Sequence, residues 1–351
     1  MRGRVGGMPV AVAESLSVEG EVGPNTRLTR TMALSHINAK FCQQQSHRPD
    51  RQMTDRYLAI LGTASQVPTR KRNHNGYFIR WGRAGYLIDP GEGTQRQMLF
   101  AGVSASDITD VFITHFHGDH CLGLPGIVQR LSLDQVSHAI RIYYPASGQG
   151  YLDNLLDASI YQRNADIELH PITQAGALAD GDVAISTERL DHTVESWGFR
   201  FSSPPTRSII SEQVDALGLA GPLIGKLKAD GEIEHHGNTV RLEDVSEVKA
   251  GFTVAFVMDT RVCAGAEALA RDADVLIIES TFGEEHVAEA ERFGHLTAAQ
   301  AARIAADGGV KKLILTHFSQ RYLDVSALQD EAAAIFAGVT MAQDGDRLAL
   351  R

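Results

Sequence analysis

Short apolar runs separated by polar and glycine-containing turns follow one another along most of the chain, and each run has the length of a strand. Before residue 252 such runs dominate, whereas after it they alternate with segments of helical periodicity. This order predicts an α/β fold in which two sheets are sandwiched between helices. We expect strands at Tyr57–Leu61, Gly76–Trp81, Gly85–Asp89, Val111–Thr114, Ile140–Tyr144, Ile167–Ile172, Val183–Leu190, Gly198–Phe201, Phe252–Met258, Val275–Glu279 and Leu313–Thr316, and helices at Gln95–Ala101, Ile127–Leu133, Tyr151–Tyr161, Ala264–Ala270, Thr297–Ala306 and Ser326–Phe336.

Two stretches lack this pattern. Residues 1–52 are rich in Gly, Ser, Arg and Gln and show no sustained period. We expect them to be a disordered leader, or a spurious extension ahead of a start near Met53. The stretch Ser202–Glu247 contains a Pro-Pro and a Gly-Pro pair and few strong strands. Long irregular insertions in compact domains are usually functional or disordered, and we interpret this one as an arm that protrudes from a catalytic domain of residues 53–351.

Composition and charge exclude several classes of protein. Hydrophobic residues make up 43% of the chain and charged residues 22%, which rules out collagen-like, coiled-coil and wholly disordered chains. No apolar run approaches the ~20 residues that span a bilayer. Cys42, Cys121 and Cys263 are odd in number, which argues against a disulfide framework and indicates a reducing, cytoplasmic setting. Because the net charge is −10, any nucleic-acid partner must meet a local basic patch.

The densest chemistry lies in the segment Thr114-His115-Phe116-His117-Gly118-Asp119-His120, directly after a predicted strand. His115 and His117 alternate, so both can point the same way from an extended backbone. Gly118 permits a sharp turn, after which Asp119 and His120 face a new direction. Imidazole and carboxylate ligands suit Zn²⁺, with Mn²⁺ or Fe²⁺ as competitors. The alternative is a histidine-rich surface turn with incidental metal affinity, and we favour the metal site.

One loop cannot complete two metal sites, and the ends of other predicted strands offer further ligands. His192, Asp259 and His317 each follow such a strand, and α/β folds place their sites at strand ends. Any one of them alone would be interpreted as a structural polar residue, but together with the loop they indicate a ligand set. His170 also lies near a strand end and competes with His192.

Several motifs give the chain a specific resemblance that runs from about Tyr57 to the C-terminal region. The metal loop resembles that of the metallo-β-lactamase superfamily, and the chain as a whole resembles the ribonuclease Z family of tRNA 3′-processing endonucleases. The motifs that carry the resemblance are Leu61-Gly62-Thr63, Pro68-Thr69-Arg70-Lys71-Arg72-Asn73, Asp89-Pro90-Gly91-Glu92-Gly93-Thr94-Gln95, His120-Cys121-Leu122-Gly123-Leu124-Pro125-Gly126, Thr316-His317-Phe318-Ser319-Gln320-Arg321-Tyr322 and Gly221-Pro222.

The resemblance implies an αββα sandwich with a protruding arm and two Zn²⁺ ions per subunit. The first ion would be held by His115, His117 and His192, the second by Asp119, His120 and His317, and Asp259 would bridge the two. Two such ions activate water and stabilise the charge that develops in phosphodiester hydrolysis.

Catalytic roles follow from the same resemblance and from simple acid–base chemistry. Asp119 would also accept a proton from the attacking water, the alternative being that it is purely a metal ligand. His295, oriented by Glu279, would protonate the leaving ribose 3′-oxygen, because a carboxylate fixes the tautomer of an imidazole and raises its pKa. Ile278 and Ser280 replace two members of the family's motif around Glu279. The alternative is that His295 only precedes the helix that follows it.

The predicted substrate is precursor tRNA, cut at its 3′ end to remove the trailer and leave a 3′-hydroxyl. The family also implies a cytoplasmic homodimer in which the arm of one subunit presents tRNA to the site of the other. The competing hypothesis is a two-metal phosphodiesterase or another small-molecule hydrolase of the superfamily. Candidate RNA-binding residues are Arg70, Arg72, Asn73, Gly221, Pro222, Lys226, Lys228 and Arg321.

Overall fold

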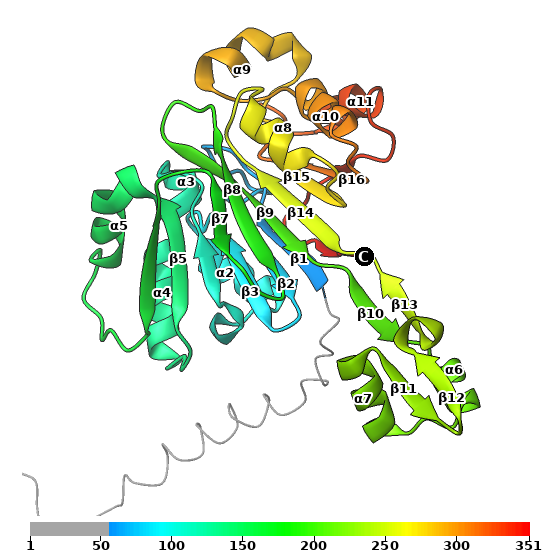
Figure 1. Cartoon of the computed structure of the whole chain (residues 1–351). Helices are drawn as coiled ribbons and strands as arrows, with labels where there is room; N and C mark the ends of the chain where they lie inside the picture. Colours follow the sequence, from blue (N-terminus) through cyan, green and yellow to red (C-terminus); the bar gives the residue numbers. More distant parts are fainter. Residues whose placement is uncertain (1–55) are drawn as a thin grey trace, which may run out of the picture. The chain divides into compact units, whose positions relative to one another are not determined.

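Two seven-stranded sheets pack against each other in the structure, a computed structural model that describes residues 56–351 (Figure 1). The expected leader at residues 1–52 lies outside the described residues. The first sheet has the order β18-β1-β2-β3-β4-β5-β6, and its strands are β1 (Arg56–Gly62), β2 (Gly76–Trp81), β3 (Ala84–Ile88), β4 (Asp110–Phe112), β5 (Ile140–Pro145), β6 (Ile167–Ile172) and β18 (Arg347–Ala349).

The second sheet has the order β17-β16-β15-β14-β9-β8-β7. Strands β14 to β17 run parallel, and β9 joins them antiparallel to β14. The strands are β7 (Gly176–Ala179), β8 (Ala184–Leu190), β9 (Ser196–Ser203), β14 (Phe252–Val257), β15 (Val275–Glu279), β16 (Lys312–Thr316) and β17 (Thr340–Met341).

Successive side chains along each strand point to opposite faces of its sheet, and they form three apolar layers. In β1, Leu58 and Ile60 belong to the cluster between the sheets, whereas Tyr57 and Leu61 face the helices outside the first sheet. The outer helices of the first sheet are α2 (Thr94–Ala101), α4 (Leu124–Leu133) and α5 (Gln149–Leu156), and those of the second are α8 (Ala264–Ala270), α10 (Ala298–Asp307) and α11 (Ser326–Ala333). The predicted αββα sandwich is therefore confirmed.

The arm is an insertion between β9 and β14, and it is better ordered than its sequence suggests. It has a small core of its own, made by Val214, Leu219, Leu227, Ile233, Val240 and Val245. The expectation of an irregular segment is wrong: the strands of the arm have only four residues each, and its ten-residue helix does not separate apolar from polar residues clearly, so no period marks them in the sequence. The elements are β10 (Thr206–Ile209), α6 (Ser211–Ala216), α7 (Gly221–Asp230), β11 (Glu232–His235), β12 (Asn238–Arg241), η4 (Leu242–Val245) and β13 (Ser246–Lys249) (Figure 1).

Most other predicted elements are present within one or two residues of their expected ends. The helix expected over Tyr151–Tyr161 ends at Leu156 instead, and Ile160 beyond it is fully exposed. The short helices α3 (Gly118–Cys121) and α9 (Val287–Phe293) were not predicted. Within residues 56–351, no helix has the length and apolar character needed to cross a membrane.

Candidate metal centre

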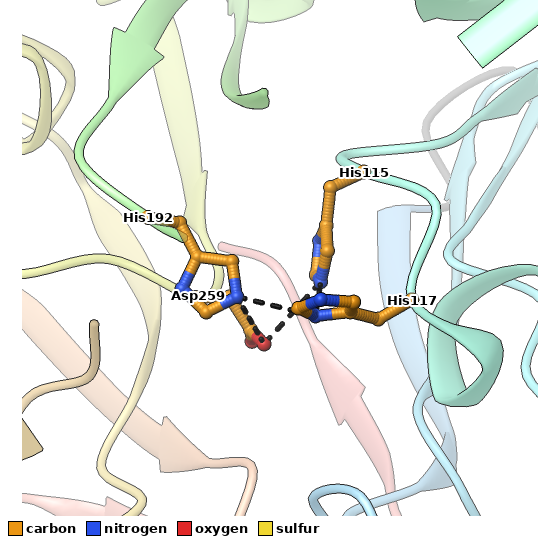
Figure 2. Close-up of side chains that lie close together, drawn as sticks. All are labelled: His115, His117, His192 and Asp259. Atoms are coloured by element: carbon orange, nitrogen blue, oxygen red, sulfur yellow. Dashed lines mark hydrogen bonds and ion pairs between the residues drawn. The ribbon is translucent and has the colours of Figure 1, made fainter. Parts of the chain in front are cut away.

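The proposed ligands come together where strands of both sheets end. The loop after β4 carries His115 to His120, and Asp259 and His317 follow β14 and β16. His192 follows β8, which runs parallel to β14 because both are antiparallel to β9. Figure 2 shows the side chains of His115, His117, His192 and Asp259 pointing toward one another from these separate loops.

The first group has the spacing of ligand atoms around a single cation. Nδ1 of His117 lies 3.1 Å from Nε2 of His115 and 3.2 Å from Nε2 of His192. Oδ2 of Asp259 lies 3.4 Å from Nε2 of His115. Tetrahedral ligands at 2.0–2.1 Å from a metal are separated from one another by about 3.3 Å. The donor set therefore fits a tetrahedral dication.

Asp119, His120 and His317 form a second group, and Asp259 lies between the two. Oδ2 of Asp119 is 3.3 Å from Nε2 of His120 and 3.6 Å from Nε2 of His317. Oδ1 of Asp259 and Nε2 of His317 lie 3.1 Å apart, and neither buried atom has a hydrogen-bond partner. Buried polar atoms without such partners call for an explanation, and a cation between them provides one.

Protonation states favour metal binding at most of these positions. Burial lowers the pKa of His115, His117 and His192, which keeps the imidazoles neutral. Burial would raise the pKa of Asp119, but His120 and hydrogen bonds outweigh it, so the carboxyl is ionised. Neutral imidazoles and ionised carboxylates are the forms that bind metals.

His120 behaves differently from the other imidazoles. Burial would lower its pKa, but the carboxylates of Asp259, Asp119 and Asp89 together raise it well above the ordinary value. A buried cluster of carboxylates that draws a proton onto an imidazole is a cluster with excess negative charge. Dications would compensate for that charge and leave Nε2 of His120 free to bind.

The ring nitrogens that face away from the metal groups are held by a second layer of contacts. Nδ1 of His120 lies 2.8 Å from Asp89, and Nδ1 of His317 lies 2.7 Å from the hydroxyl of Thr281. Nδ1 of His192 donates to the carbonyl of Gly294 at 2.8 Å. These contacts favour the tautomer in which Nε2 is free to bind a metal. Asp89 was not predicted as a site residue, although its position at the end of a strand was a usable signal.

Three residues of the centre have left-handed backbones without being glycine. The φ angle is 46° at Asp89, 41° at Asp259 and 61° at His317. Asp89 and His317 directly follow a strand, and Asp259 comes one residue after the end of β14. Each side chain therefore turns sharply out of the sheet and into the centre. Such conformations are uncommon for residues with a Cβ atom and persist only where surrounding structure holds them.

His295 and Glu279 form a pair beside the metal groups. Nδ1 of His295 lies 3.0 Å from Oε1 of Glu279, a fully buried carboxylate. Burial would lower the pKa of His295, but Glu279 and Asp259 outweigh it and raise the pKa to about 9. Glu279 also accepts hydrogen bonds from the backbone N–H of Thr260 at 2.8 Å and the hydroxyl of Thr281 at 2.5 Å. One carboxylate therefore orients His295 and, through Thr281, the candidate ligand His317.

An open cleft of about 400 Å³ leads to this centre. It gives a substrate access to both metal groups and to His295. Its lining includes Ser65, Gln66, Val67, His117, Asp119, His192, Thr193, Asp259, Thr281, Phe282, Phe293, His295, Ser319, Gln320 and Arg321.

The candidate RNA-binding residues separate into different places. Arg72 donates to the backbone carbonyl of Tyr322 at 2.6 Å, and Asn73 donates to that of Glu92 at 2.9 Å, so both hold loops of the domain. Arg70 is exposed on the same loop as Arg72, and Arg321 lines the cleft. Gly221, Pro222, Lys226 and Lys228 all lie exposed on α7 of the arm.

Comparison with known proteins finds close relatives over most of the chain. A sequence profile of the metallo-beta-lactamase superfamily matches residues 69–206. A protein named Ribonuclease Z from Nocardia farcinica is 52% identical over 301 residues, covering 85% of this chain and 99% of its own length. A Ribonuclease Z from Thermobifida fusca is 47% identical and covers 85% and 96%.

Solved structures also match most of the chain. The short form of human tRNase Z has a TM-score of 0.61 and 25% identity, and the match covers 84% of this chain and 98% of that one. The metallo-beta-lactamase fold protein YhfI from Bacillus subtilis has a TM-score of 0.62 at 20% identity. An identity this low supports the fold alone.

Proposed function

The chain belongs to the ribonuclease Z family, and from that premise we propose that it hydrolyses the phosphodiester at the 3′ end of precursor tRNA. The reaction removes the 3′ trailer and leaves a 3′-hydroxyl on the tRNA. The observation that carries the proposal is the convergence of two donor groups, bridged by Asp259, beside the His295–Glu279 pair in one cleft. The related alternative, a small-molecule phosphodiesterase, would have no use for the arm.

The cofactor is a pair of divalent cations, which we propose to be Zn²⁺, with Mn²⁺ or Fe²⁺ as substitutes. One ion would be held by His115, His117 and His192. The other would be held by Asp119, His120 and His317, and Asp259 would bind both ions. When bound, these ions supply Lewis acidity that polarises the scissile phosphate and activates water. Nitrogen-rich donors with tetrahedral spacing in the first group support the choice of zinc.

Asp119 and His295 would move the protons of the reaction. The carboxylate of Asp119 is ionised and lines the cleft, so it can accept a proton from the attacking water. His295 presents an imidazolium stabilised by Glu279 and can donate its Nε2 proton to the leaving ribose oxygen. Glu279 holds Nδ1 of His295 and thereby orients Nε2.

The remaining parts of the substrate would bind outside the cleft. The exposed Lys226 and Lys228 on α7 support contacts with tRNA phosphates, and Arg70 and Arg321 are suited to phosphates nearer the cut. The arm would act in a cytoplasmic homodimer, in which it presents tRNA to the site of the partner subunit.

A cleavage assay with defined RNAs tests the proposal. Purified protein is incubated with a precursor tRNA that carries a 3′ trailer, with the mature tRNA as control and with bis(p-nitrophenyl) phosphate in parallel. We expect the precursor to be cut to a tRNA with a 3′-hydroxyl, cleavage to stop with chelator, and Zn²⁺ to restore it. Hydrolysis of the small diester without any cleavage of the precursor would establish the phosphodiesterase alternative.

A further inference from the structure

The cleft contains one aromatic ring that its neighbours leave largely open. Phe282 is buried, and the guanidinium of Arg321 lies 4.8 Å from its ring centre. Phe293 lines the same cleft but is 46% exposed. An exposed aromatic ring beside a reaction centre is a surface on which a flat ligand can stack.

We propose that the ring of Phe293 is the stacking platform for the base of the last nucleotide retained in the product, the one whose 3′-oxygen leaves. The proposal rests on the proposed function, because it requires an RNA substrate. Stacking on an aromatic side chain accepts every base, since each base has a π-face. The platform would therefore position the substrate without reading its sequence.

Hydrogen bonds hold the backbone on both sides of Phe293 and so fix the point from which its side chain extends. Phe293 is the last residue of α9, and Gly294 after it has a φ of 75°. The N–H of His295 donates to the carbonyl of Ala290 at 2.8 Å, which closes the end of the helix. The carbonyl of Gly294 accepts the 2.8 Å hydrogen bond from His192. Three consecutive residues thus provide the platform, a support for a metal ligand and the proton donor.

The position of His295 identifies which nucleotide meets the ring. His295 would donate its proton to the ribose 3′-oxygen, so the ribose of that nucleotide must lie against His295. Its base extends from the same sugar, and Phe293, two residues from His295 in the chain, lines the same cleft. The trailer nucleotide would lie on the other side of the scissile phosphate.

One face of the ring is already supported. The guanidinium of Arg292 lies 5.2 Å from the centre of the Phe293 ring. Such a contact stabilises the orientation of an exposed ring, and an aromatic ring has a second face on which a base can stack. The exposed Phe100 on α2 offers a matched comparison, because Arg96 lies 4.7 Å from its ring centre and Phe100 is outside the cleft lining.

The test compares two precursor tRNAs that differ only in the base of that nucleotide, which is intact in one and absent in the other. We measure kcat/KM for the wild type, Phe293→Ala, Phe293→Leu, Phe293→Trp and Phe100→Ala. Removing a stacking ring is expected to cost roughly tenfold to a hundredfold on the intact RNA. Phe293→Ala should lose far less on the abasic RNA, because the partner of the ring is already missing.

The other variants sharpen the result. Phe293→Trp should keep near-normal activity, Phe293→Leu should behave like Phe293→Ala, and Phe100→Ala should match the wild type. An equal loss by Phe293→Ala on both RNAs would assign Phe293 a structural role and overturn the proposal, as would an unchanged rate on the intact RNA. A wild-type protein that cuts neither precursor would instead overturn the proposed function itself.

Discussion

The hydroxyl of Tyr77 lies 2.7 Å from the side-chain oxygen of Thr316, and this contact joins the two sheets behind the second metal group. Tyr77 also donates to Oδ1 of Asn75 at 2.7 Å, and Nδ2 of Asn75 lies 3.2 Å from Nε2 of His120. Thr316 directly precedes His317. A buried chain of polar contacts therefore connects His120 in one half of the sandwich with His317 in the other.

Removing the Tyr77 hydroxyl should weaken the second metal site selectively. In Tyr77→Phe, Asn75 and Thr316 lose a shared partner. Direct outer contacts of metal ligands are typically worth 10–100-fold in affinity, and Tyr77 lies one contact farther out. We therefore expect a smaller loss at one of the two sites, measured by competition with a chromophoric chelator. Tyr86→Phe is the control, since Tyr86 is buried in the same cluster away from the metals. Unchanged affinity at both sites would contradict the role given to Tyr77.

Replacing His295, the proposed proton donor, should lower the rate by an amount that depends on the leaving group of the substrate. His295→Ala is expected to lower kcat for precursor tRNA by 10²–10⁴-fold, the usual contribution of general acid catalysis. Bis(p-nitrophenyl) phosphate should lose much less, because nitrophenolate leaves without a proton. Metal content, measured by mass spectrometry, should not change. Equal loss on both substrates would instead place His295 among the metal-binding or structural residues.

Glu279→Gln should have two effects, because Glu279 contacts more than His295. The amide cannot stabilise the imidazolium, so the substrate-dependent loss should appear in weaker form. Its altered hydrogen bonding also disturbs Thr281, which holds Nδ1 of His317. We therefore expect faster loss of metal to a chelator than in His295→Ala. Identical metal retention in the two variants would show that the contact between Thr281 and His317 does not contribute to metal binding.

Gly294→Ala should weaken metal binding at the first site, although Gly294 is far from His192 in the sequence. An added Cβ would lie 2.8 Å from Nδ1 of His192, on a backbone with a φ of 75°. We expect weaker metal binding and lower thermal stability. Gly102→Ala is the matched control: Gly102 also ends a helix with a φ of 66°, but an added Cβ meets nothing within 4 Å. Both variants should lose stability from backbone strain, about 1–2 kcal/mol, and only Gly294→Ala should lose metal.

Removing the arm should separate RNA cleavage from phosphodiester chemistry. Ser203 of β9 pairs with Phe252 of β14, so a short turn can replace residues 204–250 without breaking the sheet. A cut within the arm, such as one ending at Glu234, would split β11 and expose the arm's own core. We expect precursor cleavage to disappear while bis(p-nitrophenyl) phosphate is still hydrolysed. Parallel loss of both activities would indicate that the arm supports the domain.

What could be predicted from the sequence was mainly what is local in the chain. The histidine loop places its donors within a few residues, and a strand such as Val275–Glu279 is one unbroken apolar run. Asp89 acts on His120 from 31 positions away, and Tyr77 meets Thr316 across 239. No local pattern marks such pairs, because they exist only once the sheets have packed. The arm was missed as an ordered unit for a related reason: its core comes from four-residue strands and from a helix without a clear apolar face.

The left-handed backbones of Asp89, Asp259 and His317 carry a cost that shapes how this protein can change. Glycine would relax each position but would remove a carboxylate or an imidazole from the centre. At Asp89 that removal would also take buried partners from Thr114 and His120. At Asp259, whose Oδ1 has no hydrogen-bond partner, the chain keeps a strained residue that glycine would relieve, which is a trade of stability against activity. Selection for thermal stability alone would therefore favour glycine at position 259 first, and a directed-evolution experiment that demands stability without activity would reveal the conflict there.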